Sequence, residues 1–371
     1  MKIAMIGHKR IPSREGGIEI VVDELSSELV KRGHSVVAYN RKGHHIAGKE
    51  FEEKPLKEYN GITLKNVFTF ESSKLNAIVY SVLAAFKAAF GRFDVVHFHA
   101  EGPASMCWLP KLFGKKVVVT IHGLDWQRSK WGGFATKFLK FGEKTAAKYA
   151  DEIIVLSKNI QDYFLETYNR KTVFIPNGVR KPQLKTASLI KERFSLSKDS
   201  YILFLGRLVP EKRVHSLIQA YKKIYTDKKL VISGSASHTD EYVDELKYIA
   251  KDDDRIIFTD FVQGEMLEEL YSNAYIYCLP SDLEGMPLSL LEAMSYGNCC
   301  LVSSIPECTE VCEDKAAVFE KGSEKDLYSK LNELISNPVM VDGYKLNAGN
   351  FICNKYSWSD IVDETLKLYS K

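Results

Sequence analysis

Residues 276–297 read IYCLPSDLEGMPLSLLEAMSYG and place a strand, a loop and a helix in direct succession. The apolar run 276–279 has the length of a buried strand. Pro287 and Gly297 stand where helices commonly begin and end. A continuous apolar strand that leads into a helix is typical of a parallel sheet covered by helices. The stretch therefore predicts an α/β fold.

Two carboxylates of this stretch are candidates for ligand binding. Glu284 is expected in the loop just before the helix, and Glu292 lies inside the helix between Leu291 and Ala293. A carboxylate among apolar neighbours is costly unless it accepts hydrogen bonds. The hydroxyl groups of a ribose would supply such donors.

The alternation of apolar strands and helix-period stretches continues on both sides of this segment. Predicted strands are 2–7, 35–39, 95–98, 117–121, 153–156, 201–205, 230–233, 256–258 and 300–302, and predicted helices are 18–32, 75–90, 213–225, 240–251 and 265–272. This pattern indicates two doubly wound domains with parallel sheets. We place them at residues 1–177 and 178–352, followed by a C-terminal segment, 353–371, that contains a further helix.

Composition excludes several classes of protein. The chain has 371 residues, 45% of them hydrophobic and 27% charged, as in ordinary soluble globular proteins. The apolar stretch 75–90 is too short to span a membrane. The N-terminus lacks the apolar region of a signal peptide, so we expect a cytoplasmic protein. The seven cysteines form no C-x-x-C pair and are interpreted as reduced core residues, and a metal shared by Cys308 and Cys312 is disfavoured.

Charge is unevenly distributed along the chain. Residues 1–177 carry 27 Lys or Arg and 18 Asp or Glu, whereas residues 178–371 carry 24 and 30. A basic first half suggests an anionic partner, such as a membrane surface, a nucleic acid or a phosphorylated substrate. Within it, residues 126–149 interleave aromatic side chains with lysines, including Lys130 and Trp131. This stretch is either a helix at a membrane interface or a packed helix with a solvated lysine face.

Two loops at predicted strand ends have the residues for phosphate binding. Gly16 and Gly17 precede a helix, where the backbone and the helix dipole favour an anion, although a tight turn would use them equally well. Arg207 and Lys212 follow the strand 201–205, where two cations can neutralise a diphosphate without a metal; the alternative is a solvated basic loop. The G-x-G-x-x-G fingerprint of dinucleotide binding is absent from the first turn, which disfavours a dehydrogenase.

Other candidate ligands are weaker. His97, His99 and His122 end two predicted strands and could bind a metal, act as bases or pack. Because no fourth ligand is evident, packing or hydrogen bonding to a substrate is favoured over a metal. The acidic triplet 252–254 has Asp-x-Asp spacing but precedes its strand, so we interpret it as a charged turn rather than a cation site.

Taken together, these motifs resemble the family 4 glycosyltransferases of the GT-B fold, and the resemblance covers nearly the full chain. The matching residues are Glu284-x7-Glu292, Gly206-Arg207-Leu208 with Glu211-Lys212, Asn177-Gly178-Val179 and Gly16-Gly17. The opening segment looks like bacterial transferases that build surface polysaccharides on a polyprenyl-diphosphate carrier.

The resemblance implies two Rossmann-like domains that face each other across a cleft. Domain 1–177 would lie on the acceptor side, domain 178–352 would bind the nucleotide sugar, and the C-terminal helix would cross back to the first domain. It also implies transfer of a hexose with retention of anomeric configuration, without a metal or another cofactor.

The family's site residues carry over to matching positions of this chain. Arg207 and Lys212 would hold the donor diphosphate and Glu292 would bond the ribose. Glu284 would face the donor sugar and His122 would lie near its hydroxyls; with Arg207 and Lys212, these form the expected catalytic set. The remaining substrate-binding residues would be Gly285, Met286, Pro287 and Leu288 at the donor, and Gly16 and Gly17 near the diphosphate and the acceptor.

We therefore expect a retaining transferase that uses a nucleoside-diphosphate sugar and a lipid-linked or saccharide acceptor at the inner face of the cell membrane, with no nucleic acid partner. UDP is favoured, but Ser235 stands where the family often has a second glycine, which leaves GDP, ADP and dTDP open. One alternative is a non-catalytic partner subunit, against which the retained charged residues argue. Another is a GT-B epimerase or phosphorylase.

Overall fold

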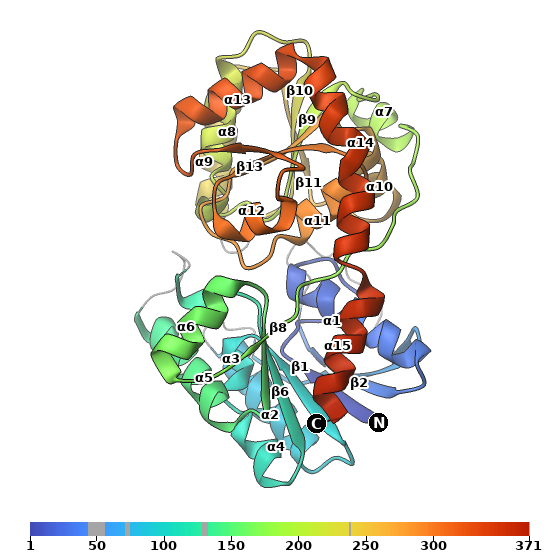
Figure 1. Cartoon of the computed structure of the whole chain (residues 1–371), viewed down its shortest axis with the longest axis vertical. Helices are drawn as coiled ribbons and strands as arrows, with labels where there is room; N and C mark the ends of the chain where they lie inside the picture. The colour runs from blue at the N-terminus through green and yellow to red at the C-terminus, as the bar shows by residue number, and fades with distance from the viewer. Residues whose placement is uncertain (44–55, 71–74, 128–132, 237–238, 371) are drawn as a thin grey trace. The chain divides into compact units, whose positions relative to one another are not determined.

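A computed structural model describes residues 1–43, 56–70, 75–127, 133–236 and 239–370. The chain divides into two compact units (Figure 1). Unit 1 comprises Met1–Gly178 and Trp358–Lys371, and unit 2 comprises Val179–Ser357. Each unit contains one largely parallel sheet with helices packed against it, so the predicted α/β class is confirmed.

Unit 1 is built on an eight-stranded sheet with the order β3-β4-β2-β1-β5-β6-β7-β8. Its elements are β1 (Lys2–Ile6), α1 (Gly17–Lys31), β2 (Ser35–Arg41), β3 (Glu58–Tyr59), β4 (Ile62–Val67), α2 (Asn76–Ala89), β5 (Val95–His99), α3 (Glu101–Ala104), α4 (Trp108–Leu112), β6 (Lys116–Ile121), the 3-10 helix η2 (Asp125–Gln127), α5 (Gly133–Tyr149), β7 (Glu152–Val155), α6 (Lys158–Tyr168), β8 (Val173–Phe174) and α15 (Trp358–Ser370).

Helices cover both faces of this sheet. Val96 and Phe98 of β5 belong to a core that includes Ala84 and Ala88 of α2. The intervening residue, His97, contacts Tyr369 of α15. Because successive strand residues point to opposite faces, α2 and α15 cover opposite sides, as expected of a doubly wound sheet.

The C-terminal helix α15 packs on unit 1, beside α1 (Figure 1). Arg32 at the end of α1 donates to Asp363 Oδ1 at 2.6 Å and to the Ser359 carbonyl at 2.9 Å. Gly178 lies against the indole of Trp358, where a Cβ would be 2.5 Å from Cδ2. The predicted C-terminal segment, 353–371, begins too early, since Cys353–Lys355 form the last turn of the preceding helix.

Unit 2 has a six-stranded sheet, entirely parallel, with the order β11-β10-β9-β12-β13-β14. Its elements are α7 (Leu189–Phe194), β9 (Tyr201–Leu205), the 3-10 helix η3 (Pro210–Lys212), α8 (Val214–Lys222), β10 (Lys229–Ser233), α9 (Asp240–Ala250), β11 (Ile256–Asp260), α10 (Gly264–Asn273), β12 (Ile276–Leu279), α11 (Leu288–Ser295), β13 (Cys299–Ser303), α12 (Pro306–Cys312), β14 (Ala317–Phe319), α13 (Glu324–Ser336) and α14 (Pro338–Lys355).

The prediction of purely parallel sheets is wrong at one edge. β3 pairs antiparallel with β4, and neither strand was predicted. β4 alternates buried and exposed residues instead of forming a continuous apolar run, because it lies near the edge of the sheet. The short strands β8 and β14 were also missed.

Six of the seven cysteines are buried in the core, as predicted, whereas Cys353 is partly exposed. Burial raises the pKa of Cys107 and of Cys299 to about 12, so these thiols are uncharged at neutral pH. They pack as small apolar side chains.

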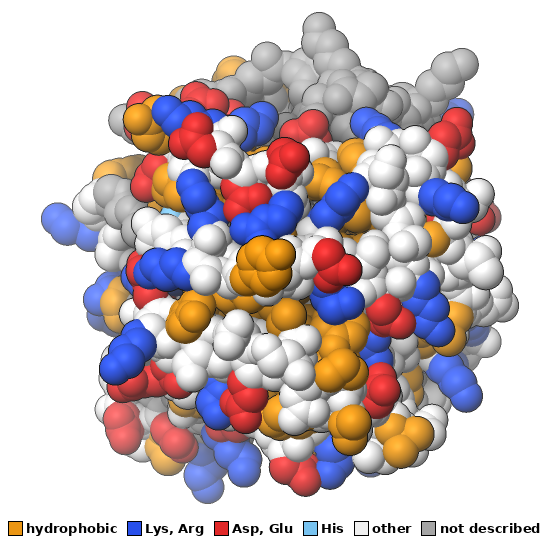
Figure 2. All heavy atoms as spheres, turned by 90° about the horizontal axis from the view of Figure 1, so that it is seen from above, with side chains coloured by type: hydrophobic (Ala, Val, Ile, Leu, Met, Phe, Trp, Pro, Cys, Tyr) orange, Lys and Arg blue, Asp and Glu red, His pale blue; other side chains and the backbone are white. Residues whose placement is uncertain are grey.

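Charged side chains of both signs are interspersed on the face drawn in Figure 2. Among the residues that this view draws in colour, neither sign forms a continuous field. No described helix combines the length and the apolar composition needed to cross a membrane.

Candidate active site

In the candidate site of unit 2, the backbone segments that follow β9 and β10 are in direct contact. The Gly206 amide donates to the Ser233 carbonyl at 3.0 Å. A Cβ at Gly234, whose φ is +147°, would lie 1.8 Å from the Gly206 carbonyl oxygen. Only glycine fits at position 234, both for its φ and for this contact. The chain can therefore turn sharply at the carboxyl edge of the sheet, where ligands of α/β sheets bind.

Lys212 and Glu284 form an ion pair at this edge. Lys212 lies in η3, which follows β9, and Glu284 lies in the loop between β12 and α11. Their side chains are 11% and 9% exposed. The pairing neutralises two charges that would be costly to bury alone. Two residues that sequence analysis singled out separately are thus in direct contact.

Backbone conformation and a second set of contacts tie the same two loops together. Arg213 has a left-handed φ of +53°, which ends η3 before α8 begins. Its guanidinium lies 3.6 Å from Asp282 Oδ2. The Asp282 amide donates to the Glu211 carbonyl at 2.9 Å. The loop that carries Lys212 and the loop that carries Glu284 are therefore held as one structure.

The remaining residues that were predicted to bind the sugar donor lie at the same edge of unit 2. Arg207 is partly exposed just after β9. Gly285, Met286 and Pro287 are buried before α11, and Leu288 begins that helix. Pro287 was predicted as the first helical residue, but it is the N-cap because its ψ of 100° is extended. Its carbonyl accepts from the amides of Leu290 and Leu291.

Glu292 is partly buried in α11 and already has a hydroxyl donor within the chain. Tyr271 of α10 donates its hydroxyl to Glu292 Oε2 at 3.1 Å. The Tyr271 ring is buried and stacks on Tyr296, with the centroids 5.3 Å apart. Tyr271 was not singled out from the sequence, since it occupies an ordinary core position of a helix. It orients the carboxylate from the protein side.

Three buried hydroxyls at the carboxyl ends of strands have no hydrogen-bond partner within the described chain. They belong to Ser233 at the end of β10, Ser281 after β12 and Ser303 at the end of β13. Buried polar atoms are normally paired. Together with the Lys212–Glu284 pair they give this edge several polar groups.

Unit 1 has a second polar edge, formed by two histidines of β5 and one that follows β6. His99 Nδ1 lies 3.0 Å from His122 Nε2. The His97 ring stacks on His99 with a centroid separation of 4.2 Å. His97 is held by Thr120 Oγ1 at 2.7 Å from Nε2 and by the Tyr369 hydroxyl at 2.6 Å from Nδ1. The three predicted histidines are brought together by hydrogen bonds and stacking, and no three metal-binding side chains of the described residues form a cluster.

Burial keeps these imidazoles neutral. It lowers the pKa of His97 to about 3 and that of His122 to about 4, and holds that of His99 well below its ordinary value. His8, after β1, is a further buried histidine whose pKa burial lowers to about 4, and it contacts Asn40 at 2.9 Å. At neutral pH each ring therefore carries a single N–H.

The backbone beside these rings is strained. Ala100 follows β5 with φ 75° and ψ 159°, a region that residues other than glycine rarely occupy. A Cβ at Gly7, whose φ is +126°, would lie 2.1 Å from the His99 carbonyl oxygen. Such strain persists only where the surrounding structure enforces it, and it concentrates at functional sites.

Gly16 and Gly17 open α1 near a charged loop. Gly16 is the N-cap in an extended conformation, and a Cβ there would lie 2.7 Å from Glu19 Oε2. Glu19 is buried and accepts from the Lys9 amide at 2.8 Å. The N-terminus of this helix thus already contacts a carboxylate of its own first turn.

Comparison with known protein families identifies the family of this chain. A family model described as Glycosyltransferase Family 4 matches residues 15–181, and one described as Glycosyl transferases group 1 matches residues 187–350. The chain belongs to the family 4 glycosyltransferases. The GT-B fold class predicted from the sequence is confirmed.

Individual relatives of this glycosyltransferase support the family assignment, and a solved structure supports the fold. The glycosyltransferase MJ1607 of Methanocaldococcus jannaschii is 25% identical over 100% of this chain and 98% of its own length. The capsular polysaccharide biosynthesis glycosyltransferase CapM of Staphylococcus aureus is 25% identical over 68% of this chain and 70% of its own. The structure of Anabaena HepE in complex with UDP and glucose has a TM-score of 0.82 at 17% identity, covering 100% of this chain and 99% of HepE.

The basic aromatic stretch of the glycosyltransferase forms α5 and the preceding turn. Trp126 packs inward, donating from Nε1 to the buried Glu143 at 3.0 Å. Phe134 and Phe141 are instead 70% and 57% exposed on α5, on the side that also bears the exposed Lys137, Lys144 and Lys148. Lys140 is exposed as well and lies over the Trp126 ring. Residues 128–132, with Lys130 and Trp131, lie outside the described residues. The helix is therefore packed on one face and aromatic and basic on the other.

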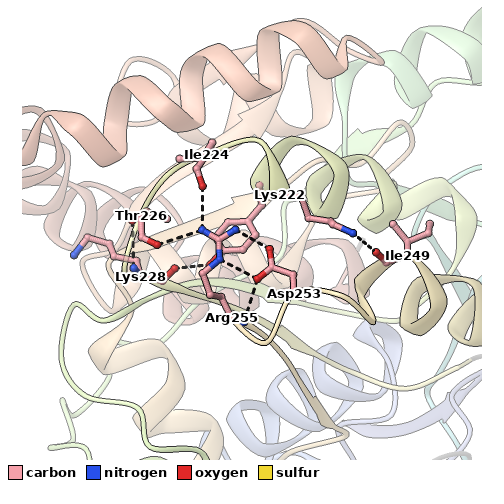
Figure 3. Close-up of polar contacts among 8 residues, drawn as sticks. Lys222, Ile224, Thr226, Lys228, Ile249, Asp253 and Arg255 are labelled. Atoms are coloured by element: carbon pink, nitrogen blue, oxygen red, sulfur yellow. Dashed lines mark hydrogen bonds and ion pairs between the residues drawn. The ribbon is translucent and has the colours of Figure 1, made fainter.

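The acidic triplet 252–254 has a structural role at Asp253 (Figure 3). Arg255 donates to Asp253 Oδ2 at 2.7 Å and to Oδ1 at 2.9 Å. The same guanidinium donates to the carbonyls of Ile224 and Thr226 and lies over the Tyr221 ring. We call Arg255 and these partners the arginine clamp. Asp253 belongs to it and lies in the turn between α9 and β11, consistent with the predicted charged turn.

Proposed function

We propose that this glycosyltransferase transfers a hexose, with retention of configuration, from a UDP-sugar to a lipid-linked or saccharide acceptor. The observation that carries the proposal is the Lys212–Glu284 pair at the carboxyl edge of unit 2. A lysine and a carboxylate held together there supply a cation for a diphosphate and an acceptor for sugar hydroxyls.

The proposed chemistry breaks the bond between the anomeric carbon and the diphosphate oxygen. Negative charge develops on that oxygen, and Arg207, Lys212 and the N-terminus of α11 stabilise it. The acceptor hydroxyl attacks from the same face and loses its proton to the departing phosphate, so configuration is retained. This route requires neither a protein nucleophile nor a divalent cation.

The other predicted residues have supporting parts in this proposal. Glu292, oriented by Tyr271, bonds the ribose, and the backbone of Gly285, Met286, Pro287 and Leu288 lies along the donor. Within unit 1, His122 is the residue proposed to bond sugar hydroxyls, and Gly16 and Gly17 are those proposed to bind the diphosphate and the acceptor.

A uridine donor is supported by HepE, which was solved with UDP and glucose, and a surface-glycan acceptor by CapM, named for capsular polysaccharide synthesis. The test is thermal unfolding with UDP, GDP, ADP or dTDP, without divalent metal and then with it. A ligand at 100 times its Kd adds about 2.7 kcal/mol of stability. We expect a metal-independent rise in Tm with UDP. A rise in Tm with GDP, ADP or dTDP alone would mean that the donor carries that nucleotide instead of UDP. Nucleotide binding without release of sugar from the nucleotide sugar would favour a non-catalytic partner subunit.

The acceptor proposal includes binding to an anionic membrane surface through α5. Exposed phenylalanines between lysines suit the headgroup region, where aromatic rings insert and lysines meet lipid phosphates. Reversing the charges of Lys137, Lys140 and Lys144 should abolish sedimentation with phosphatidylglycerol vesicles. Matched reversals of Lys223, Lys247 and Lys251, exposed in unit 2, should leave it intact. Equal vesicle binding by both variants would contradict the membrane role.

A further inference from the structure

The histidine pair of unit 1 restricts how His122 can act. His99 Nδ1 and His122 Nε2 face each other at 3.0 Å, so one of these two nitrogens carries the shared proton and the other accepts it. Since both rings are neutral, each carries one proton, and the donor in this contact decides where the other ring's proton lies. If His99 donates from Nδ1, the proton of His122 is on Nδ1. If His122 donates from Nε2, the proton of His99 is on Nε2.

The second nitrogen of His99 decides between these arrangements. His99 Nε2 is buried and has no partner within the described chain. If His99 accepted the shared proton, its own proton would sit on Nε2 as a buried, unpaired N–H donor. Among backbone groups, buried N–H donors without a partner are rarer than under-satisfied acceptors, and we apply the same preference to the imidazole nitrogens. The proton therefore belongs on His99 Nδ1, which donates to His122 Nε2.

The surroundings of His99 fix its ring and backbone. The stacked His97 ring is held at both nitrogens, by Thr120 and by the Tyr369 hydroxyl of the C-terminal helix. The His99 backbone is held against Gly7, where no side chain fits. His99 is thus a rigid donor rather than a side chain that can turn over to satisfy either tautomer.

We propose that His99 is a positioning residue that holds His122 as the Nδ1–H tautomer, so that His122 presents a hydrogen-bond donor to an oxygen of the ligand. His122 is partly exposed, and its Nδ1 is not among the buried unpaired atoms. With Nε2 occupied by His99, Nδ1–H is the only polar group this ring offers to a ligand. His122 then orients a sugar hydroxyl and does not remove a proton from it. The sugar as ligand rests on the proposed function; the tautomer does not.

The tautomer can be measured in the free protein. In the full chain labelled with 15N-histidine, ring 1H–15N correlation spectra distinguish protonated from bare nitrogens, and His122→Gln identifies the His122 signals. We expect protonated Nδ1 and bare Nε2. In His99→Leu, which removes the donor, His122 should become a mixture of tautomers, whereas His99→Asn, whose amide can donate from a similar position, should preserve Nδ1–H. His8→Gln is the matched control, because His8 is equally buried but contacts Asn40.

Two results would overturn the proposal: protonated Nε2 on His122 in the unmodified protein, or an unchanged His122 spectrum in His99→Leu. The ligand side is tested separately with UDP and UDP-glucose. His99→Leu should reduce the preference for UDP-glucose over UDP by about fivefold, while His99→Asn restores it and UDP affinity itself stays constant. Failure of the unmodified protein to bind UDP-glucose would contradict the proposed donor and leave the tautomer result intact.

Discussion

Lys212 and Glu284, which are 72 positions apart in the sequence, form an ion pair whose side chains are both about nine-tenths buried. A buried pair of this kind contributes little net stability, but removing one partner leaves an uncompensated charge. The proposed function and the stability are therefore coupled at this position, and a test of the site has to separate them.

A pair of variants makes that separation. Lys212→Ala should lower turnover about a hundredfold, because in the proposed mechanism the cation stabilises the leaving diphosphate in the transition state. It should also cost about 3 kcal/mol of stability, since Glu284 is left unpaired. The double variant Lys212→Met/Glu284→Gln removes both charges and should recover most of the Tm without recovering turnover. Near-normal turnover of Lys212→Ala at a temperature where it is folded would refute the assignment.

The Tyr271–Glu292 hydrogen bond leads to a binding prediction. Tyr271→Phe removes a donor that orients the carboxylate, and it should weaken UDP binding by about fivefold, or about 1 kcal/mol. Glu292→Ala should weaken it further, with a smaller effect on kcat. Tyr277→Phe is the matched control, because it removes a hydroxyl that bonds Ser289 on the same helix instead of Glu292. Calorimetric titration with UDP measures all three, and unchanged affinity in both Tyr271→Phe and Glu292→Ala would rule out the ribose role.

Much of the fold was predictable because most strands are buried on both faces. Continuous apolar runs such as those of β9 and β12 differ from everything around them, and both were predicted within their observed bounds. β4 was missed because only every second or third of its residues is buried. The two-residue strand β8 is too short to produce any periodic signal.

The candidate site was predictable only residue by residue. Lys212 and Glu284 were each singled out, but their contact joins two loops that are distant in the sequence and that meet through the Glu211–Asp282 backbone hydrogen bond. Tyr271 and Tyr369 were missed because they look like core residues, and their hydroxyl contacts arise from segments distant in the sequence. A sequence pattern indicates which side chains face an edge, but not which of them touch.

The docking of the C-terminal helix can be tested at Gly178. In Gly178→Ala the added methyl would lie 2.5 Å from the Trp358 indole, a bulky group that cannot move without shifting α15. We expect a loss of about 1–3 kcal/mol, seen as a lower Tm and faster amide exchange in α15. The control is Gly343→Ala, at an exposed position inside α14 with nothing within 4 Å of the new methyl. That substitution should raise stability by about 0.5–1 kcal/mol. Equal Tm changes in the two variants would contradict the packing.

The arginine clamp around Asp253 predicts a pH dependence of stability. Hydrogen bonds from Arg255 hold the pKa of the Asp253 carboxyl below its ordinary value, which is about 3.9 in an unfolded chain. A carboxyl with a depressed folded-state pKa stabilises the protein above the unfolded pKa, and this stabilisation is lost as pH falls through the folded pKa. The unmodified protein should therefore lose stability below about pH 4 more steeply than Arg255→Gln, in which that contribution is already absent. Urea unfolding between pH 7 and pH 3 measures the difference.

Lys315→Gln is the control for this prediction. It removes the partner of the exposed Asp314 and should leave the pH profile unchanged, because solvent screens that pair. Parallel profiles for the unmodified protein and Arg255→Gln would show that the clamp does not set the protonation of Asp253.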